Sequence, residues 1–279
     1  MNICFLEDPY TFLNPEGFLK SLLALGVTIT AEPDENTQII YNASVTRFKR
    51  VLDAKQKAPH AKIVNYCWDY YLWAHEGKHT LDWRGYAEML KVCDAILVPS
   101  KGQQRRLKEL LGLDSVVVVT GIDTYDHETS DERFVLDPVR YYEEDPQCYW
   151  VRDACKELNI PYLHSNHGFS QEEFRRLVST CTIMTCGFVE ASTGGLSLME
   201  GLFNGKASLV SSSPYMGASD YIGPYGNYFT DYEDLKVKLD QLFNNPPVLN
   251  KDELRNYMKA YSFDAMALRI LDVCTRLTN

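Results

Sequence analysis

The stretch Ser192-Thr-Gly-Gly-Leu-Ser-Leu-Met-Glu200-Gly-Leu-Phe-Asn-Gly-Lys-Ala-Ser-Leu-Val-Ser211 joins three patterns in direct succession. Two glycines precede an amphipathic run that ends at Asn204-Gly205, and a short apolar run follows. These patterns predict a loop, then a helix, then a buried strand. Gly194 and Gly195 let the backbone approach a ligand closely, and the first amides of the helix attract an anionic group such as a diphosphate. Glu200, about one and a half turns into the helix, offers a carboxylate to sugar hydroxyls. An ordinary loop, helix and strand without a ligand is the alternative.

The same alternation of strand and helix patterns continues along all 279 residues. Strands are predicted at residues 2–7, 38–42, 62–67, 95–99, 115–119, 133–137, 160–163, 181–186 and 207–212. Helices are predicted at residues 15–25, 44–57, 84–93, 101–111, 147–158, 170–179, 196–204, 233–244 and 251–276. This alternation predicts the α/β class, with parallel sheets covered by helices. We place a domain boundary near Asp123, which gives two doubly wound, Rossmann-like domains, residues 1–123 and 124–279, facing a ligand cleft at the carboxyl ends of their strands.

Composition is typical of a water-soluble protein of this size. The chain is 45% hydrophobic and has a net charge of −10. No apolar run reaches the roughly 20 residues that span a bilayer, and the first residues have the pattern of a strand instead of a signal peptide. The eight cysteines form no Cys-x-x-Cys pair and predict reduced thiols. We therefore expect a cytoplasmic protein, with peripheral membrane contact still open.

Several segments resemble one family in the order in which that family has them. Retaining glycosyltransferases of family 4 have a donor-binding signature that contains Glu-Gly-Phe-Gly-Leu, three residues, Glu, and then Ala-(x)3-Gly-Lys-Pro-Val-Val. Here the matching places hold Gly195, Leu196, Glu200, Gly205 and Lys206. Further matches are Cys93-Asp-Ala-Ile-Leu-Val-Pro-Ser100, Val116-Val-Val-Val-Thr-Gly-Ile-Asp123, Asp220-Tyr-Ile-Gly223, Gly226-Asn-Tyr-Phe-Thr-Asp231 and Glu233-Asp-Leu235. The resemblance covers about residues 90 to 279, and the chain is similar to a short, divergent member.

The resemblance implies the GT-B fold, in which the first domain binds an acceptor and the second binds a nucleotide-sugar. It implies a hexosyl- or pentosyltransferase that moves the sugar to an acceptor hydroxyl with retained anomeric configuration. No cofactor and no metal are expected, and the most favoured co-substrate is a UDP-sugar. The last helix should pack back on the first domain. A non-catalytic glycosyltransferase-like binding domain is an alternative.

The resemblance also assigns the donor-binding residues. Glu200 takes the place of the carboxylate that binds the nucleotide ribose. Ser192 stands where the signature has its first Glu, with Glu190 two residues earlier, and Gly194, Gly195 and Leu196 belong to the same segment. Gly168 follows a predicted strand, at a place where the family has a glycine that contacts the donor.

Negative charge develops on the departing diphosphate during sugar transfer, and cationic side chains stabilise it. The family has an Arg and a Lys after the first strand of the second domain. Arg140 fits the first place and is a catalytic candidate, whereas Asp145 stands where the Lys is expected. Three other cations are candidates to approach the diphosphate: Arg175, Arg176 and Lys206.

The first domain has an aromatic and titratable cluster directly after a predicted strand. Trp68 and Tyr70 are candidates to contact an acceptor, and Asp69 and His75 are catalytic candidates, although the aromatic residues also suit a core. The family often has a Gly-Gly pair in the first loop, before the first helix. Gly17 is the candidate to replace this pair and to contact the acceptor.

His75-Glu-Gly-Lys-His79 also matches His-Glu-x-x-His, the pattern of zinc peptidases, with Glu76 as general base. Gly77 weakens the helix that this pattern requires, and no third ligand is evident downstream. We treat a zinc peptidase as the alternative from another class.

A basic stretch in the first domain, with Arg47, Arg50 and Lys57 on about one helical face, is the best indication of the acceptor. It suits a saccharide, a phosphorylated glycolipid at an anionic membrane, or a hydroxymethylated base in viral DNA, although a pI near 5.1 argues against DNA. A solvated helix surface is the alternative. The sequence leaves the oligomeric state open.

Overall fold

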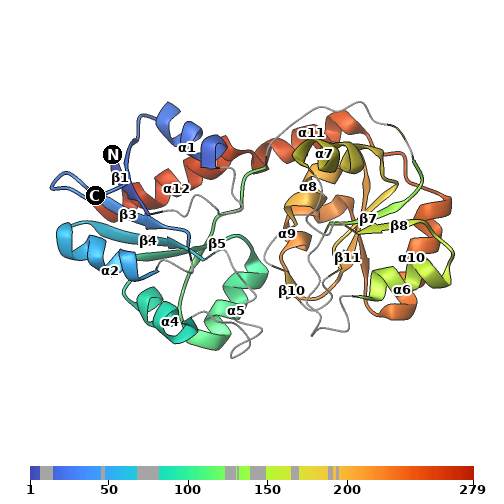
Figure 1. Cartoon of the computed structure of the whole chain (residues 1–279), viewed down its shortest axis with the longest axis horizontal. Helices are drawn as coiled ribbons and strands as arrows, with labels where there is room; N and C mark the ends of the chain where they lie inside the picture. Colours follow the sequence, from blue (N-terminus) through green and yellow to red (C-terminus); the bar gives the residue numbers. More distant parts are fainter. Residues whose placement is uncertain are drawn as a thin grey trace. The chain divides into compact units, whose positions relative to one another are not determined.

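The computed structural model describes residues 1–6, 15–44, 48–67, 82–122, 130, 132–138, 149–164, 170–187, 191–192 and 195–279. The chain forms two compact units, Met1–Gly121 with Tyr261–Asn279, and Ile122–Ala260. Each unit is a parallel sheet with helices on both faces (Figure 1). The predicted α/β class with doubly wound, Rossmann-like sheets is therefore confirmed. Among the described helices, none is long and apolar enough to cross a membrane.

The first unit has a six-stranded sheet of order β2-β1-β3-β4-β5-β6. Its strands are β1 (Asn2–Phe5), β2 (Thr28–Thr30), β3 (Ile39–Asn42), β4 (Lys62–Tyr66), β5 (Ala95–Val98) and β6 (Val116–Val117). Its helices are α1 (Pro15–Ala24), α2 (Phe48–Lys57), α4 (Trp83–Lys91), α5 (Lys101–Leu111) and α12 (Phe263–Thr278). The chain goes outward from β1 to β2 and then crosses to β3, so the switch point of this doubly wound sheet lies between β1 and β3.

Helix α12 belongs to the core of the first unit although it is the last element of the chain. It packs on α1 and contributes Met266, Ala267 and Ile270, each fully buried, to the same apolar cluster as β1, β3 and β4. Asp264 of α12 accepts a 2.6 Å hydrogen bond from the Ser21 hydroxyl of α1. The C-terminal segment therefore completes the first sheet's helical layer.

The second unit has a five-stranded sheet of order β13-β11-β9-β7-β8. Its strands are β7 (Val135–Asp137), β8 (Tyr162–His164), β9 (Ile183–Thr185), β11 (Ala207–Ser211) and β13 (Gly226–Phe229), with a separate pair β10 (Ala191–Ser192) and β12 (Tyr215–Met216). Its helices are α6 (Trp150–Glu157), α7 (Gln171–Thr180), α8 (Leu196–Phe203), α9 (Ala218–Ile222), α10 (Tyr232–Asn244) and α11 (Lys251–Met258). In Figure 1, α6 and α10 cover one face of this sheet, and α7, α8 and α11 cover the other.

Two differences from the predicted elements have local causes. The pattern at residues 251–276 is not one helix, because α11 ends at Met258 and the Ser262 side chain caps α12 by accepting from the Ala265 amide at 3.2 Å. The edge strands β2 and β13 were not predicted. Both are short and largely half-exposed, so neither has the apolar pattern of a buried strand.

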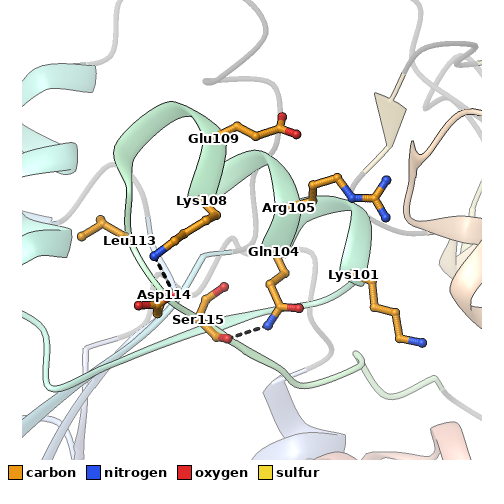
Figure 2. A pocket seen from close by; sticks show the side chains of 8 residues that line it. All are labelled: Lys101, Gln104, Arg105, Lys108, Glu109, Leu113, Asp114 and Ser115. Atoms are coloured by element: carbon orange, nitrogen blue, oxygen red, sulfur yellow. Dashed lines mark hydrogen bonds and ion pairs between the residues drawn. The ribbon is translucent and has the colours of Figure 1, made fainter.

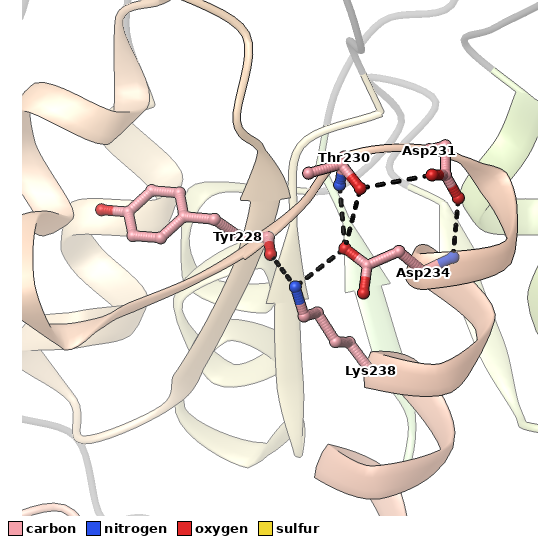
Figure 3. Close-up of polar contacts among 5 residues, drawn as sticks. All are labelled: Tyr228, Thr230, Asp231, Asp234 and Lys238. Atoms are coloured by element: carbon pink, nitrogen blue, oxygen red, sulfur yellow. Dashed lines mark hydrogen bonds and ion pairs between the residues drawn. The ribbon is translucent and has the colours of Figure 1, made fainter.

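The segment Thr230-Asp231, part of the stretch matched to the family, caps α10 (Figure 3). Asp231 accepts from the Asp234 amide at 2.9 Å, and Asp234 accepts from the Thr230 amide at 2.9 Å, which is a reciprocal cap. Lys238, one turn later, donates to Asp234 at 2.8 Å and also to the Tyr228 carbonyl. These contacts join the end of β13 to the first two turns of α10.

We expect this cap to make stability depend on pH. The pKa of Asp234 lies below its usual value, first because of the Lys238 hydrogen bond and then because of the Thr230 amide. A carboxyl whose pKa is depressed in the folded state stabilises the fold fully when the pH is above the pKa of that carboxyl in the unfolded state. The stabilisation is lost as the pH falls through the pKa of the carboxyl in the folded state. The stability difference between wild type and Asp234→Asn should therefore be present at pH 7 and shrink in acid. Thermal melts from pH 7 to pH 2, with Asp240→Asn on the same helix as control, test this; a constant difference contradicts it.

Candidate functional site

The carboxyl ends of the strands in the second sheet form the candidate site, which we call the carboxyl edge. The chain goes outward from β7 to β8 and then crosses to β9, so the switch point lies between β7 and β9. Ligands of doubly wound sheets bind at such points. Along the chain, β10 follows β9 and β12 follows β11, and the register of the β10–β12 pair sets Ser192 beside Met216. The segment of the signature therefore begins at this edge.

Helix α8 differs from most described helices at its N-terminus. A Ser, Asp or Asn side chain caps six helices, namely α4, α5, α7, α10, α11 and α12. Gly195 is the N-cap of α8, and no side chain accepts a hydrogen bond there. Among the residues that the structure describes, no side chain therefore caps the first amides of α8, including that of Leu196, and amides in such a position bind water or an anionic ligand.

Close packing also requires a glycine at position 195, in addition to the predicted close approach of the backbone to a ligand. A Cβ at this position would lie 2.8 Å from the Ala218 Cβ of α9 and 3.1 Å from Leu198 Cδ1. Gly201, later in the same helix, would meet Met184 Cγ of β9 at 2.6 Å. The glycines thus hold α8 tightly between α9 and the sheet, which fixes the position of its N-terminus.

Glu200 is half-buried in α8, between residues that face the core. Met199 and Gly201 on either side of it are buried against the sheet. Its backbone carbonyl accepts from the Asn204 amide at 3.1 Å and from the Asn204 side chain at 2.8 Å, which ends the helix. The carboxylate is therefore carried by a rigid element a little more than one turn from the uncapped end.

Two of the alternative cations lie at the opposite edge of this sheet. Lys206 immediately precedes β11 and donates to the Ser130 carbonyl at 3.2 Å. Arg176 pairs with Glu132, which precedes β7, at 3.0 Å. Both contacts are at the amino ends of the strands, so neither side chain extends toward the carboxyl edge. Arg175 is half-buried in α7.

Many predicted site residues lie outside the described part of the chain. They are Arg47, Trp68, Asp69, Tyr70, His75, Glu76, His79, Arg140, Asp145, Gly168, Glu190 and Gly194, and Ser192 is described by its backbone alone. The predicted roles of these residues stay predictions. Within the described ranges, no group of three or more His, Cys, Asp or Glu residues is placed to hold a metal ion.

In the first unit, Gly17 and Arg50 have structural contacts. A Cβ on Gly17 would lie 2.8 Å from the ring of Phe263, so this glycine lets α1 approach α12. Arg50 and Lys57 both pair with Glu32, at 3.6 and 3.0 Å. The described part of the predicted basic face is thus partly neutralised at the surface.

A buried polar chain crosses the first sheet near the ends of β3 and β4. The Asn42 amide donates to Asn65 Oδ1 at 2.6 Å, and the Asn65 amide donates to the Tyr86 hydroxyl at 2.9 Å, all three being fully buried. Gln103 of α5, also buried, donates to the Cys67 carbonyl at 2.6 Å. Sequence reasoning missed these residues, although a polar residue inside an apolar strand pattern was an available signal for Asn42 and Asn65. They fix where the segment after Cys67 begins.

Two surface hollows of the first unit contain none of the predicted site residues. One, of about 490 Å³, runs along α5. In it, Lys108 forms an ion pair with Asp114 at 2.8 Å, and Lys101 points away from that pair (Figure 2). The other, of about 690 Å³, lies between α2 and α4 and has Leu52 and Val92 at its rim. We assign no ligand to either.

Comparison with known proteins identifies the fold. Neither a protein-family model nor a curated protein matches the chain. Among solved structures, sucrose-phosphate synthase from Thermosynechococcus elongatus has a TM-score of 0.73 at 11% identity, covering 99% of this chain and 98% of that one. Anabaena HepE in complex with UDP and glucose has 0.71 at 13%, covering 99% and 100%. The pneumococcal O-GlcNAc transferase GtfA, in complex with UDP and GlcNAc, has 0.58 at 13%, covering 92% and 58%. The chain therefore has the GT-B fold of these glycosyltransferases.

Proposed function

We propose that the chain is a glycosyltransferase that moves a sugar from a UDP-sugar to an acceptor hydroxyl. One observation carries the proposal. The N-terminus of α8, which no described side chain caps, lies at the carboxyl edge of the second sheet with Glu200 a little more than one turn away, in a chain that matches UDP-bound HepE over its full length. Amides at a helix N-terminus stabilise a diphosphate, and a carboxylate accepts hydrogen bonds from ribose hydroxyls.

The finer parts of the proposal rest on the family-4 resemblance. The match from Gly195 to Lys206 supports retention of anomeric configuration and a mechanism without a metal. Arg140 and the amides of α8 then stabilise the charge that develops on the departing diphosphate. The first unit binds the acceptor, and Asp69 and His75 are the groups that we propose to act near the acceptor hydroxyl.

A thermal-shift series tests the donor site. UDP, GDP, ADP and CMP are compared at equal concentration, first with EDTA and then with Mg²⁺ or Zn²⁺. We expect UDP alone to stabilise the protein, by about 2.7 kcal/mol at a concentration 100 times its Kd, and EDTA not to weaken the effect. Stabilisation by Zn²⁺ without a nucleotide would instead favour the His75–His79 peptidase.

Activity distinguishes a transferase from a binding domain. We expect slow release of UDP from a UDP-sugar by hydrolysis, and faster release once the right acceptor is present. NMR of the released or transferred sugar reports the anomeric configuration, and inversion would contradict the retaining mechanism. Binding of UDP without any turnover over an acceptor panel would leave a non-catalytic domain.

A further inference from the structure

Asp137 is a fully buried carboxylate at the switch point of the second sheet. It is the last residue of β7, the strand between β8 and β9, and its exposed fraction is 0%. Burying a carboxylate costs several kcal/mol unless hydrogen bonds compensate. The hydrogen bonds of Asp137 therefore show how the fold compensates for a carboxylate buried at the switch point.

The two oxygens of Asp137 bind groups from the two neighbouring strands. Oδ2 accepts from the Tyr162 hydroxyl of β8 at 3.1 Å, and Oδ1 accepts from the amide of Gly187, two residues after β9, at 3.2 Å. Burial, and then the charge of Asp137, hold the pKa of Tyr162 well above its ordinary value, so the phenol stays protonated and keeps donating. One carboxylate thus joins the ends of the three strands at the switch point.

Three segments with predicted donor contacts begin where these strands end. Residues 139–148 follow β7 and carry Arg140, residues 165–169 follow β8 and carry Gly168, and residues 188–190 follow Gly187 and carry Glu190. The starting points of the three segments are held relative to one another by the bonds to Asp137. A small change in the spacing of the strand ends alters any ligand contact that depends on two of them.

We propose that Asp137 is a positioning residue of the donor site, because it holds together the ends of β7, β8 and β9 at the switch point, where ligands of doubly wound sheets bind. The inference rests on the proposed function. It assigns Asp137 no contact with the donor. The inference treats the two ends of the nucleotide separately, because the Glu200 carboxylate binds the ribose without help from Asp137.

The experiment compares UDP with uridine as ligands of the full chain. Calorimetry for UDP and NMR titration for uridine are run well below the melting temperature of each variant. We expect Asp137→Ala to weaken UDP about tenfold and to leave uridine unchanged. Asp137→Asn has the same shape and can still bond to both partners, so it should stay within about threefold of wild type for UDP.

A second variant covers the case in which Asp137→Ala does not fold. Tyr162→Phe removes the hydrogen bond from Tyr162 to Asp137 at nearly constant side-chain volume, and we expect it to weaken UDP binding about threefold. Tyr232→Phe is the matched control, because the Tyr232 hydroxyl donates to Glu157 at 2.8 Å on the outer helices of the same unit. It should leave UDP binding unchanged.

The outcomes separate this inference from the proposed function. Absence of nucleotide binding by the wild type overturns both. If the wild type binds UDP but folded Asp137→Ala and Tyr162→Phe bind it equally well, Asp137 has a structural role alone and the inference is wrong. Equal weakening of UDP and uridine contradicts it too, since a general loosening of the unit acts on both ligands.

Discussion

Gly121→Ala should destabilise the first unit by about 3 kcal/mol, the upper end of what overpacking usually costs. A Cβ on Gly121 would lie 2.6 Å from the Cα of Phe263 and 2.7 Å from its amide nitrogen. Real Cβ atoms do not approach backbone this closely, and backbone cannot rotate away as a side chain does. Alanine at this position must therefore displace the first turn of α12.

Displacement of α12 is costly because this helix completes the core of the first unit. Met266, Ile270 and Cys274 are fully buried against the first sheet and α1. The Gly121 amide also donates to Met266 Sδ at 3.2 Å. Urea unfolding followed by tryptophan fluorescence and circular dichroism measures the effect, which should appear in the midpoint without a large change in slope.

Gly17→Ala is the matched control on the other side of Phe263. Its Cβ would meet the ring alone, 2.8 Å from Cδ2, and an alanine in α1 gains up to about 1 kcal/mol of helix propensity. The added variant Phe263→Ala should relieve Gly17→Ala fully but Gly121→Ala only in part, because it removes the ring contact at both glycines and leaves the backbone contacts at Gly121. A double-mutant cycle with equal coupling at both glycines would contradict this explanation.

The fold was largely predictable because its central strands, such as β5 and β11, are buried on both faces. Runs such as Cys93–Val98 and Val116–Thr120 carry apolar residues that a helix pattern does not explain, and the structure places β5 and β6 there. The break at Ser262 was predictable in principle from its capping pattern. It was missed because the helix-forming residues on both sides of it give one continuous signal. The half-exposed strand β13 has no such signal.

The candidate site was less predictable because contacts across strands decide it. The sequence identifies the α8 segment through its glycines and Glu200, which are local features. Asp137 and Tyr162 are 25 positions apart, and their hydrogen bond exists because β7 and β8 are neighbours in the sheet. Sequence reasoning included Asp137 in a strand and gave it no role. A carboxylate at the end of an apolar strand was the available sign.

Glu200→Ala should weaken UDP binding about 10- to 100-fold, the effect of losing hydrogen bonds between a carboxylate and two ribose hydroxyls. The ribose contact is the same in the bound substrate and in the transition state, so KM for the UDP-sugar should rise while kcat changes little. Glu233→Ala, in the first turn of α10, removes an exposed carboxylate of the same unit and should leave both constants unchanged. Thermal melts without ligand show whether either variant has lost its fold.

A UDP analogue that lacks the two ribose hydroxyls allows a thermodynamic cycle between the substitution at Glu200 and the removal of those hydroxyls. Wild type should bind 2′,3′-dideoxy-UDP about 10- to 100-fold more weakly than UDP, and Glu200→Ala should bind the two ligands equally. The cycle isolates the ribose contact, because effects of the substitution on the fold or on the diphosphate are common to both ligands. If Glu200→Ala still discriminates as strongly as wild type, the carboxylate does not bind the ribose. Since α8 is held rigidly by Gly195 and Gly201, the donor would then have to lie elsewhere on the carboxyl edge.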